Sequence, residues 1–122
     1  MADLSYQRGD VVWITISSKQ VAGHEQKENR PAIVVQNDIS NRNLTTTIVV
    51  PLTDAANIRK LGPNHVLIKK GAGNLAKDSI ALCHRITTVD VEKRVLARIG
   101  CLDKKIMSEI GTAMKITLAI ED

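Results

Sequence analysis

The sequence predicts a small, mainly β domain that ends in one helix, and three observations support this fold class. Several short segments are rich in β-branched residues and are separated by turn residues, which is typical of the strands of a barrel-like sheet. The final segment changes to helical spacing. The chain has 122 residues, the length of one domain. We therefore expect a single domain over residues 1–122, a small β-barrel of the β or α+β class.

The strands are predicted from runs of β-branched and apolar residues. In chain order they cover residues 10–17, 31–37, 45–52, 65–69, 79–83 and 94–99. In the first of them, alternation places Val12 and Ile14 on one face and Trp13 on the other. Pro31 is expected to open the second strand, where a missing N–H is tolerated. Residues 18–30 are polar and highly charged, so a long loop is expected there.

The last segment, residues 104–119, is predicted to form a helix. Asp103 precedes it as a plausible N-cap. Its apolar residues recur three and four positions apart, at Ile106, Met107, Ile110, Met114 and Leu118. This stripe is expected to pack on the sheet.

Composition excludes several classes of protein. The net charge is +4, which favours a nucleic-acid partner only weakly, because solvated loops explain it equally well. Tyr6 and Trp13 are the only aromatic residues, so the core must be aliphatic. Cys83 and Cys101 are too few for a disulfide framework and are interpreted as reduced. No apolar run approaches the roughly 18 residues of a membrane span. We expect a cytoplasmic protein with no membrane contact.

Metal and nucleotide chemistry find little support in the sequence. The three histidines, His24, His65 and His84, lie far apart, and neither cysteine has a partner at metal-ligand spacing. The glycines of residues 71–73 lack the rest of a nucleotide-binding loop. Residues 8–10 read Arg-Gly-Asp, which we interpret as a turn before a strand. No metal and no cofactor are expected.

The most informative stretch is residues 23–31, Gly-His-Glu-Gln-Lys-Glu-Asn-Arg-Pro. It combines an imidazole, carboxylates, an amide and the guanidinium of Arg30, and Pro31 restricts Arg30 to extended geometry. Such a set can hold a phosphodiester and move protons without a metal. A merely solvated charged loop is the alternative.

Several blocks of the chain together resemble one known family. They are residues 8–13 (Arg-Gly-Asp-Val-Val-Trp), 23–26 (Gly-His-Glu-Gln), 30–38 (Arg-Pro-Ala-Ile-Val-Val-Gln-Asn-Asp), 47–53 (Thr-Ile-Val-Val-Pro-Leu-Thr), 87–90 and 99–102. In this order and spacing the chain resembles the MazF/PemK family of toxin endoribonucleases.

The resemblance implies a fold and an activity. It implies a homodimeric SH3-like barrel that cuts single-stranded RNA, with mRNA the expected substrate, at short sequences. A cognate antitoxin would silence it, and unrestrained activity would arrest growth. The 2′-OH of the substrate would attack the adjacent phosphate without a metal, leaving a 2′,3′-cyclic phosphate and a free 5′-OH. DNA lacks this attacking group.

The resemblance also implies roles for individual residues. Arg30 matches the essential arginine, which stabilises the phosphate or protonates the leaving oxygen. Thr53 matches a threonine that hydrogen-bonds the scissile phosphate, and His24 matches a histidine that assists proton transfer in one branch. Glu25 and Gln26 match residues that shape the loop and the RNA groove.

The chain departs from the family's pattern at several positions. His84 and Arg85 stand where relatives commonly have an acidic residue and Gln, and Thr87 stands in place of an arginine. His84 can replace the acidic residue as base, since imidazole titrates near neutral pH. The alternatives are that the base lies elsewhere or that this member is slow. Residues 27–29 lack the usual glycine before the Arg-Pro pair. We place the two basic residues Lys27 and Arg85 in the RNA-binding set.

Trp13 has two interpretations. It can stack a base or a partner's side chain, or it can pack in a second core layer or at a dimer seam. The function also has alternatives: a gyrase-poisoning toxin of the same fold, a non-catalytic RNA-binding barrel, or a toxin that has lost activity.

Overall fold

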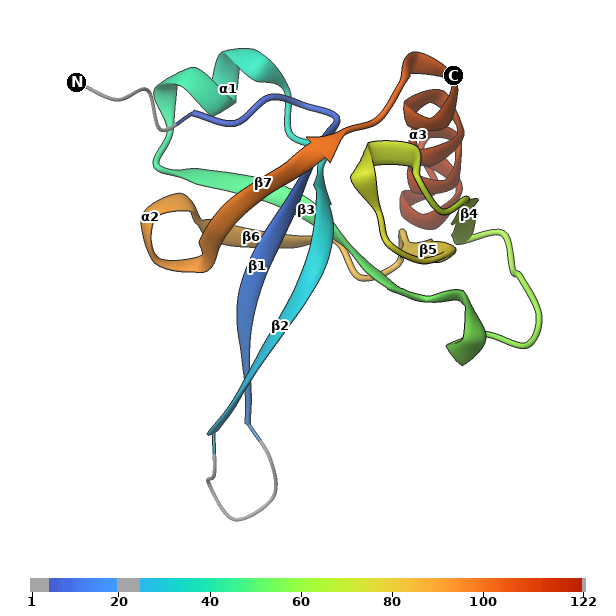
Figure 1. Cartoon of the computed structure of the whole chain (residues 1–122). Coiled ribbons are helices and arrows are strands. Elements are labelled where there is room, and N and C mark those ends of the chain that lie inside the picture. The colour runs from blue at the N-terminus through green and yellow to red at the C-terminus, as the bar shows by residue number, and fades with distance from the viewer. Residues whose placement is uncertain (1–4, 20–24, 122) are drawn as a thin grey trace.

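The computed structural model describes residues 5–19 and 25–121 (Figure 1). The strands are β1 Asp10–Lys19, β2 Glu25–Val34, β3 Thr46–Asp54, β4 His65–Ile68, β5 Ser79–Leu82, β6 Thr87–Asp90 and β7 Val95–Cys101. The helices are α1 Asp38–Asn43, α2 Val91–Arg94 and α3 Lys104–Leu118, with short 3-10 turns η2 Ala55–Asn57 and η3 Ala72–Asn74. The predicted mainly β class with a C-terminal helix is confirmed.

The strands pair antiparallel in the order β4-β5-β3-β2-β1-β7, and β6 also pairs with β3. Strand β3 is the junction of the sheet. Its first part pairs with β2 and β6, and the part from Leu52 onward pairs with β5 instead. Strands β4 and β7 end the path of pairings, so the described strands form an open sheet rather than a closed barrel.

The prediction of a long loop over residues 18–30 is wrong. Strand β1 continues to Lys19 and β2 begins at Glu25, and these two residues pair with each other. In Figure 1 this hairpin projects from the sheet as a long arm. Its sequence is charged and lacks the apolar alternation that marks a half-buried strand, so the sequence conceals the strands here. Residues 20–24, which include His24, lie outside the described residues.

Pro31 does not open the second strand but lies inside it, opposite Trp13. Pairing between β2 and β3 ends at Ala32, so at Pro31 the strand has β1 as its paired neighbour and no longer β3. A proline without an N–H is tolerated at such an edge.

Two short elements escaped prediction. Helix α1 begins after Asn37, whose side chain accepts a hydrogen bond from the Ser40 N–H at 2.8 Å. Strand β6 has only four residues and carries a single buried one, Val89. Strand β7 runs past Gly100, which was expected to end it. A Cβ at Gly100 would lie 2.6 Å from the carbonyl oxygen of Gly73, so the glycine lets η3 pack on this strand.

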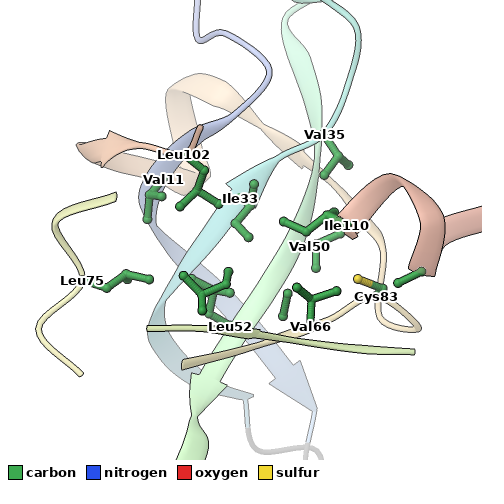
Figure 2. Packing of buried hydrophobic residues seen from close by; sticks show 13 residues of the cluster. Val11, Ile33, Val35, Val50, Leu52, Val66, Leu75, Cys83, Leu102 and Ile110 are labelled. Atoms are coloured by element: carbon green, nitrogen blue, oxygen red, sulfur yellow. The ribbon is translucent and has the colours of Figure 1, made fainter. Parts of the chain in front are cut away.

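The core consists of two clusters of aliphatic residues, one on each face of the sheet. The larger cluster lies between the sheet and α3, and Figure 2 shows Ile110 of the helix beside Val50 of β3. The smaller cluster is formed by Val12, Ile14, Ala32, Val34, Val49, Val89 and Val95, with Tyr6 packed against it. The expectation of an aliphatic core is confirmed.

Helix α3 agrees with its prediction except at its end. The Asp103 carboxylate caps it by accepting a hydrogen bond from the Ile106 N–H at 2.9 Å. Ile110 is buried, and Ile106, Met107 and Met114 pack partly buried against the larger cluster. Leu118, predicted to belong to the stripe, is 56% exposed because it lies at the last turn of the helix.

A buried polar cluster, formed by Gln36, Asn41 and Thr47, holds α1 to the sheet. The Asn41 Oδ1 accepts hydrogen bonds from Gln36 Nε2 at 2.9 Å and from Thr47 Oγ1 at 2.7 Å. Its Nδ2 donates to the Gln36 carbonyl oxygen at 3.0 Å and to Asp38 Oδ1 at 3.2 Å. The amide of Asn41 is thus fully satisfied, as a buried polar group requires.

Both cysteines are free, Cys83 in the core and Cys101 at the surface. Burial raises the pKa of the Cys83 thiol to about 11, so this thiol stays protonated and inert at neutral pH. None of the helices in the described part of the chain is long and apolar enough to cross a membrane.

Candidate functional site

Arg30 lies near the point where the arm joins the sheet. It pairs with Ile14 of β1, and its side chain is 21% exposed. Its Nη2 donates to the Glu28 carboxylate at 2.5 Å. Its Nε is buried and has no hydrogen-bond partner among the residues that the structure describes. A buried donor without a partner costs about 1–3 kcal/mol. A ligand approaches the guanidinium through the part of the side chain that remains exposed.

Thr53 lies at the same height along the strands as Arg30, at the point where β2 and β3 stop pairing and separate. The last pair between these strands joins Ala32 to Pro51. Because the strands are antiparallel, Arg30 and Thr53 each lie two residues beyond that pair in the same direction. The Thr53 Oγ1 accepts a hydrogen bond from Asn57 Nδ2 at 3.0 Å. The predicted pair of phosphate-contacting residues therefore lies at corresponding positions of two strands that separate.

A mostly apolar groove of about 390 Å³ opens where these two strands separate. Its lining residues are Trp13, Pro31, Leu52, Thr53, Asp54, Asn74, Leu75, Ala76, Lys77, Ser79 and Ile99. Trp13 is 38% exposed, so its ring lines the groove rather than filling a sealed core position. Arg30 is not among the lining residues. By strand alternation it shares the face of Ala32, opposite to that of Pro31.

The rim of the groove carries an ion pair. Lys77 Nζ lies 3.4 Å from the Asp54 carboxylate. The pKa of Asp54 is lowered below its usual value, chiefly by a hydrogen bond from the Ala56 N–H and also by Lys77. The groove thus offers an aromatic surface together with one anionic and one cationic group, each able to hydrogen-bond a ligand.

His84, predicted as a catalytic residue, lies away from the groove lining. It follows β5 on the surface, and its ring packs edge-on against His65, with the ring centroids 5.6 Å apart. The His65 Nδ1 accepts a hydrogen bond from the Gly62 N–H at 2.9 Å. Within the described residues, no hydrogen bond or ion pair joins His84 to Arg30 or Thr53. Arg85 is exposed in the same turn.

The remaining predicted residues lie in the arm. Glu25, Gln26 and Lys27 are strand residues of β2 and pair with Lys19, Ser18 and Ser17. They line the hairpin instead of a loop. His24 lies beyond the described part of the chain. The structure therefore neither joins these residues to the groove nor separates them from it.

Sequence reasoning overlooked Glu28 as a site residue. The signal was present, because Glu28 and Arg30 are two positions apart and thus share a face once the segment is a strand. Interpreting residues 18–30 as a loop concealed this relation. Among the described residues, no three His, Cys, Asp or Glu side chains gather as metal ligands.

Comparison with known proteins defines the class to which this fold and site belong. The model of the PemK-like, MazF-like toxins of type II toxin–antitoxin systems matches residues 7–118. Endoribonuclease EndoA of Bacillus subtilis is 38% identical over 116 residues, covering 95% of this chain and 97% of that protein. Endoribonuclease MazF of Staphylococcus epidermidis is 37% identical over 116 residues, covering 95% and 93% of the two chains.

Solved structures share the fold at lower sequence identity. A mycobacterial endoribonuclease in complex with its cognate antitoxin has a TM-score of 0.75 at 19% identity and covers 97% of this chain and 99% of that one. MazF in a MazE–MazF complex from Deinococcus radiodurans also gives 0.75, at 20% identity, with 96% and 98% covered. The class is that of endoribonuclease toxins. The chain belongs to the PemK-like, MazF-like toxin family of type II toxin–antitoxin systems.

Proposed function

We propose that this toxin cuts single-stranded RNA at short specific sequences, by attack of the substrate's own 2′-OH and without a metal. The observation that carries the proposal is Arg30, a largely buried arginine that lies level with Thr53 where β2 and β3 separate, and whose Nε has no partner in the described part of the chain. A guanidinium in this state stabilises the negative charge that develops on a phosphate during attack. The products are a 2′,3′-cyclic phosphate and a 5′-OH end.

In this proposal the RNA substrate crosses the point where β2 and β3 separate. Arg30 and the Thr53 hydroxyl donate hydrogen bonds to the scissile phosphate, while the Thr53 Oγ1 still accepts from Asn57 Nδ2. A neighbouring base enters the groove and meets the exposed ring of Trp13. The two histidines His24 and His84 transfer protons, because an imidazole changes charge near neutral pH.

The arm and the β5–β6 turn extend the RNA-binding surface. We assign Glu25, Gln26 and Lys27 of the arm to groove shape and RNA contact, and Arg85 to the RNA backbone. Basic residues in such positions give an affinity that falls as salt rises. The expected substrate is mRNA in the cytoplasm, where a cognate antitoxin also holds the toxin inactive.

We further propose that the toxin is a homodimer. A second groove, of about 400 Å³, lies between β4 and α3. Leu67 and Ile116 line it and remain 38% and 54% exposed in the single chain. Apolar side chains left exposed beside a groove suit burial against a second copy. A sedimentation measurement that gives a monomer at micromolar concentration would contradict this part of the proposal.

The proposed cleavage is tested with two RNA substrates and two variants. The substrates are a cleavable RNA and the same RNA with 2′-deoxyribose at the cut nucleotide. Wild-type protein should cut only the first. Arg30→Ala should cut neither but still bind the deoxy substrate, whereas Arg42→Ala, at an exposed arginine of α1, should behave like wild type.

Other outcomes identify the alternatives. RNA that is bound but left intact by folded, antitoxin-free protein indicates a non-catalytic binder or an inactive toxin. RNA that is neither bound nor cut directs attention to a protein target, as for the gyrase-poisoning toxins of this fold.

A further inference from the structure

We propose that Glu28 is the general base of the cleavage reaction, taking the proton of the attacking 2′-OH while Arg30 holds the phosphate. The inference rests on the proposed RNA cleavage and adds a residue to it. The family resemblance does not assign this role to Glu28, and the proton-transfer roles given above belong to His24 and His84.

The first argument is position. Glu28 and Arg30 are neighbours on one face of β2, opposite Ile16 and Ile14 of β1. A carboxylate oxygen of Glu28 lies 2.5 Å from Nη2 of Arg30. A general base must come within hydrogen-bond reach of the proton it removes, and the 2′ oxygen is the direct neighbour of the phosphate in RNA. A phosphate on Arg30 therefore brings the 2′-OH toward Glu28.

The second argument is exposure. The Glu28 side chain is 54% exposed, whereas that of Arg30 is 21% exposed. The carboxylate is thus open to an incoming substrate, and the guanidinium beneath it is anchored by packing. A purely structural ion pair of this exposure contributes only about 0–1 kcal/mol to stability. The fold does not depend on this carboxylate.

The third argument is that the pair leaves Arg30 with spare donors. An arginine side chain has five N–H donors, and the bond to Glu28 uses Nη2. The Nε–H is buried and has no partner among the described residues, so a phosphate binds through the remaining Nη–H donors. The phosphate can therefore bind the guanidinium while the carboxylate stays in place, so base and phosphate are held side by side.

The proton and bond changes balance. The O2′–H bond breaks and its proton passes to the Glu28 carboxylate as the O2′–P bond forms. The P–O5′ bond then breaks, and the leaving 5′ oxygen takes a proton from solvent. Glu28 releases the proton it accepted back to solvent. No proton or water is consumed overall, and the RNA ends in a 2′,3′-cyclic phosphate and a 5′-OH.

The test compares Glu28→Gln with wild type on the cleavable RNA and on its 2′-deoxy analogue. The amide keeps the size of the side chain and can still accept a hydrogen bond from Arg30, but it cannot take a proton. Cleavage at saturating RNA should fall by about 10²–10⁴-fold. Affinity for the uncleavable analogue should stay within a few-fold of wild type. Glu92→Gln, at an exposed glutamate of α2, serves as the matched control and should leave both unchanged.

A second variant separates a chemical role from a structural one. In Glu28→Ala, added acetate or formate should restore part of the lost cleavage, because a small carboxylate can enter the vacated position. Loss of a structural contact would not respond to these anions. The absence of rescue overturns the proposal, even where cleavage has fallen.

Two further results are decisive. If Glu28→Gln cuts as fast as wild type, Glu28 is not the base, while the proposed cleavage stands. Faster cutting means that Glu28 instead competes with RNA for Arg30. If wild type itself leaves RNA intact, the proposed function fails and the base with it.

Discussion

The two ends of strand β2 meet different surroundings. At its C-terminal end, Ala32 and Ile33 lie between β1 and β3, and both side chains are fully buried. Toward the arm, Glu28 and Arg30 pair with β1 beyond the last contact with β3, and one Arg30 donor has no partner among the described residues. One strand thus supplies stability at one end and, in the proposed mechanism, the reacting groups at the other. The change of surroundings falls at Pro31, where β2 still pairs with β1 but no longer with β3.

A second contrast follows from hydrogen bonding. In the polar cluster of Gln36, Asn41 and Thr47, the amide of Asn41 is fully hydrogen-bonded to neighbouring groups of the protein. At Arg30 the protein leaves hydrogen-bonding capacity unused. Satisfied polar groups hold a fold together, while an unsatisfied one is available to a ligand. Substitutions at the two places should therefore affect different measurements.

Of the substitutions that test this contrast, Arg30→Lys has the largest expected effect. Lysine keeps the charge but loses the planar set of donors that holds a phosphate. We expect RNA cleavage to fall by about 10²–10³-fold, as for the loss of one donor to a developing oxyanion. Thermal unfolding, measured in parallel by circular dichroism, should shift by no more than a few degrees. A variant that cuts at the wild-type rate would contradict the role of the guanidinium.

Asn41→Ala should produce the reverse pattern. It leaves the side chains of Gln36 and Thr47 as buried polar groups without their shared acceptor, so the free energy of unfolding should fall by about 2–3 kcal/mol. Urea unfolding measures this loss. Cleavage per folded molecule should remain near wild type at low temperature. Asn43→Ala, at an exposed residue of the same helix, provides the control and should cost much less.

Trp13→Leu should weaken RNA binding more than it slows the chemical step. A base that stacks on an aromatic ring gains about 1–3 kcal/mol, so affinity for the uncleavable RNA should fall by roughly 5- to 100-fold. Fluorescence anisotropy with labelled RNA measures this change, and Ile39→Ala, at an exposed residue of α1, is the control. Unchanged affinity would favour the interpretation of Trp13 as a packing residue.

The smallest effect concerns the two thiols. The folded protein keeps Cys83 protonated up to a pKa of about 11, whereas in the unfolded chain the thiol ionises near its ordinary value of 9.0. Its contribution to stability is therefore complete below pH 9 and is lost as the pH rises toward 11. At pH 8 a thiol reagent should label Cys101 quickly and Cys83 only as the protein opens. Equal labelling rates would contradict the burial of Cys83.

The sequence predicts most of the strands and the helix α3, because their apolar spacing reflects the core they face. It fails in the arm, where the charged sequence of the two strands carries no such spacing. The same failure conceals Glu28, since its relation to Arg30 exists only in extended backbone. Arg30 and Thr53 are predicted through the family resemblance. Their placement on two strands that separate depends on the pairing of Ala32 with Pro51, which no local pattern reveals.

The measurement that tests the central claim most directly is identification of the RNA ends left by wild-type protein in the presence of EDTA. Mass spectrometry of the fragments should find 2′,3′-cyclic phosphate and 5′-OH ends at a short, recurring sequence, since Arg30 and its neighbours need no metal for the attack. Fragments with 3′-OH and 5′-phosphate ends, or cleavage that disappears with EDTA, would contradict the claim.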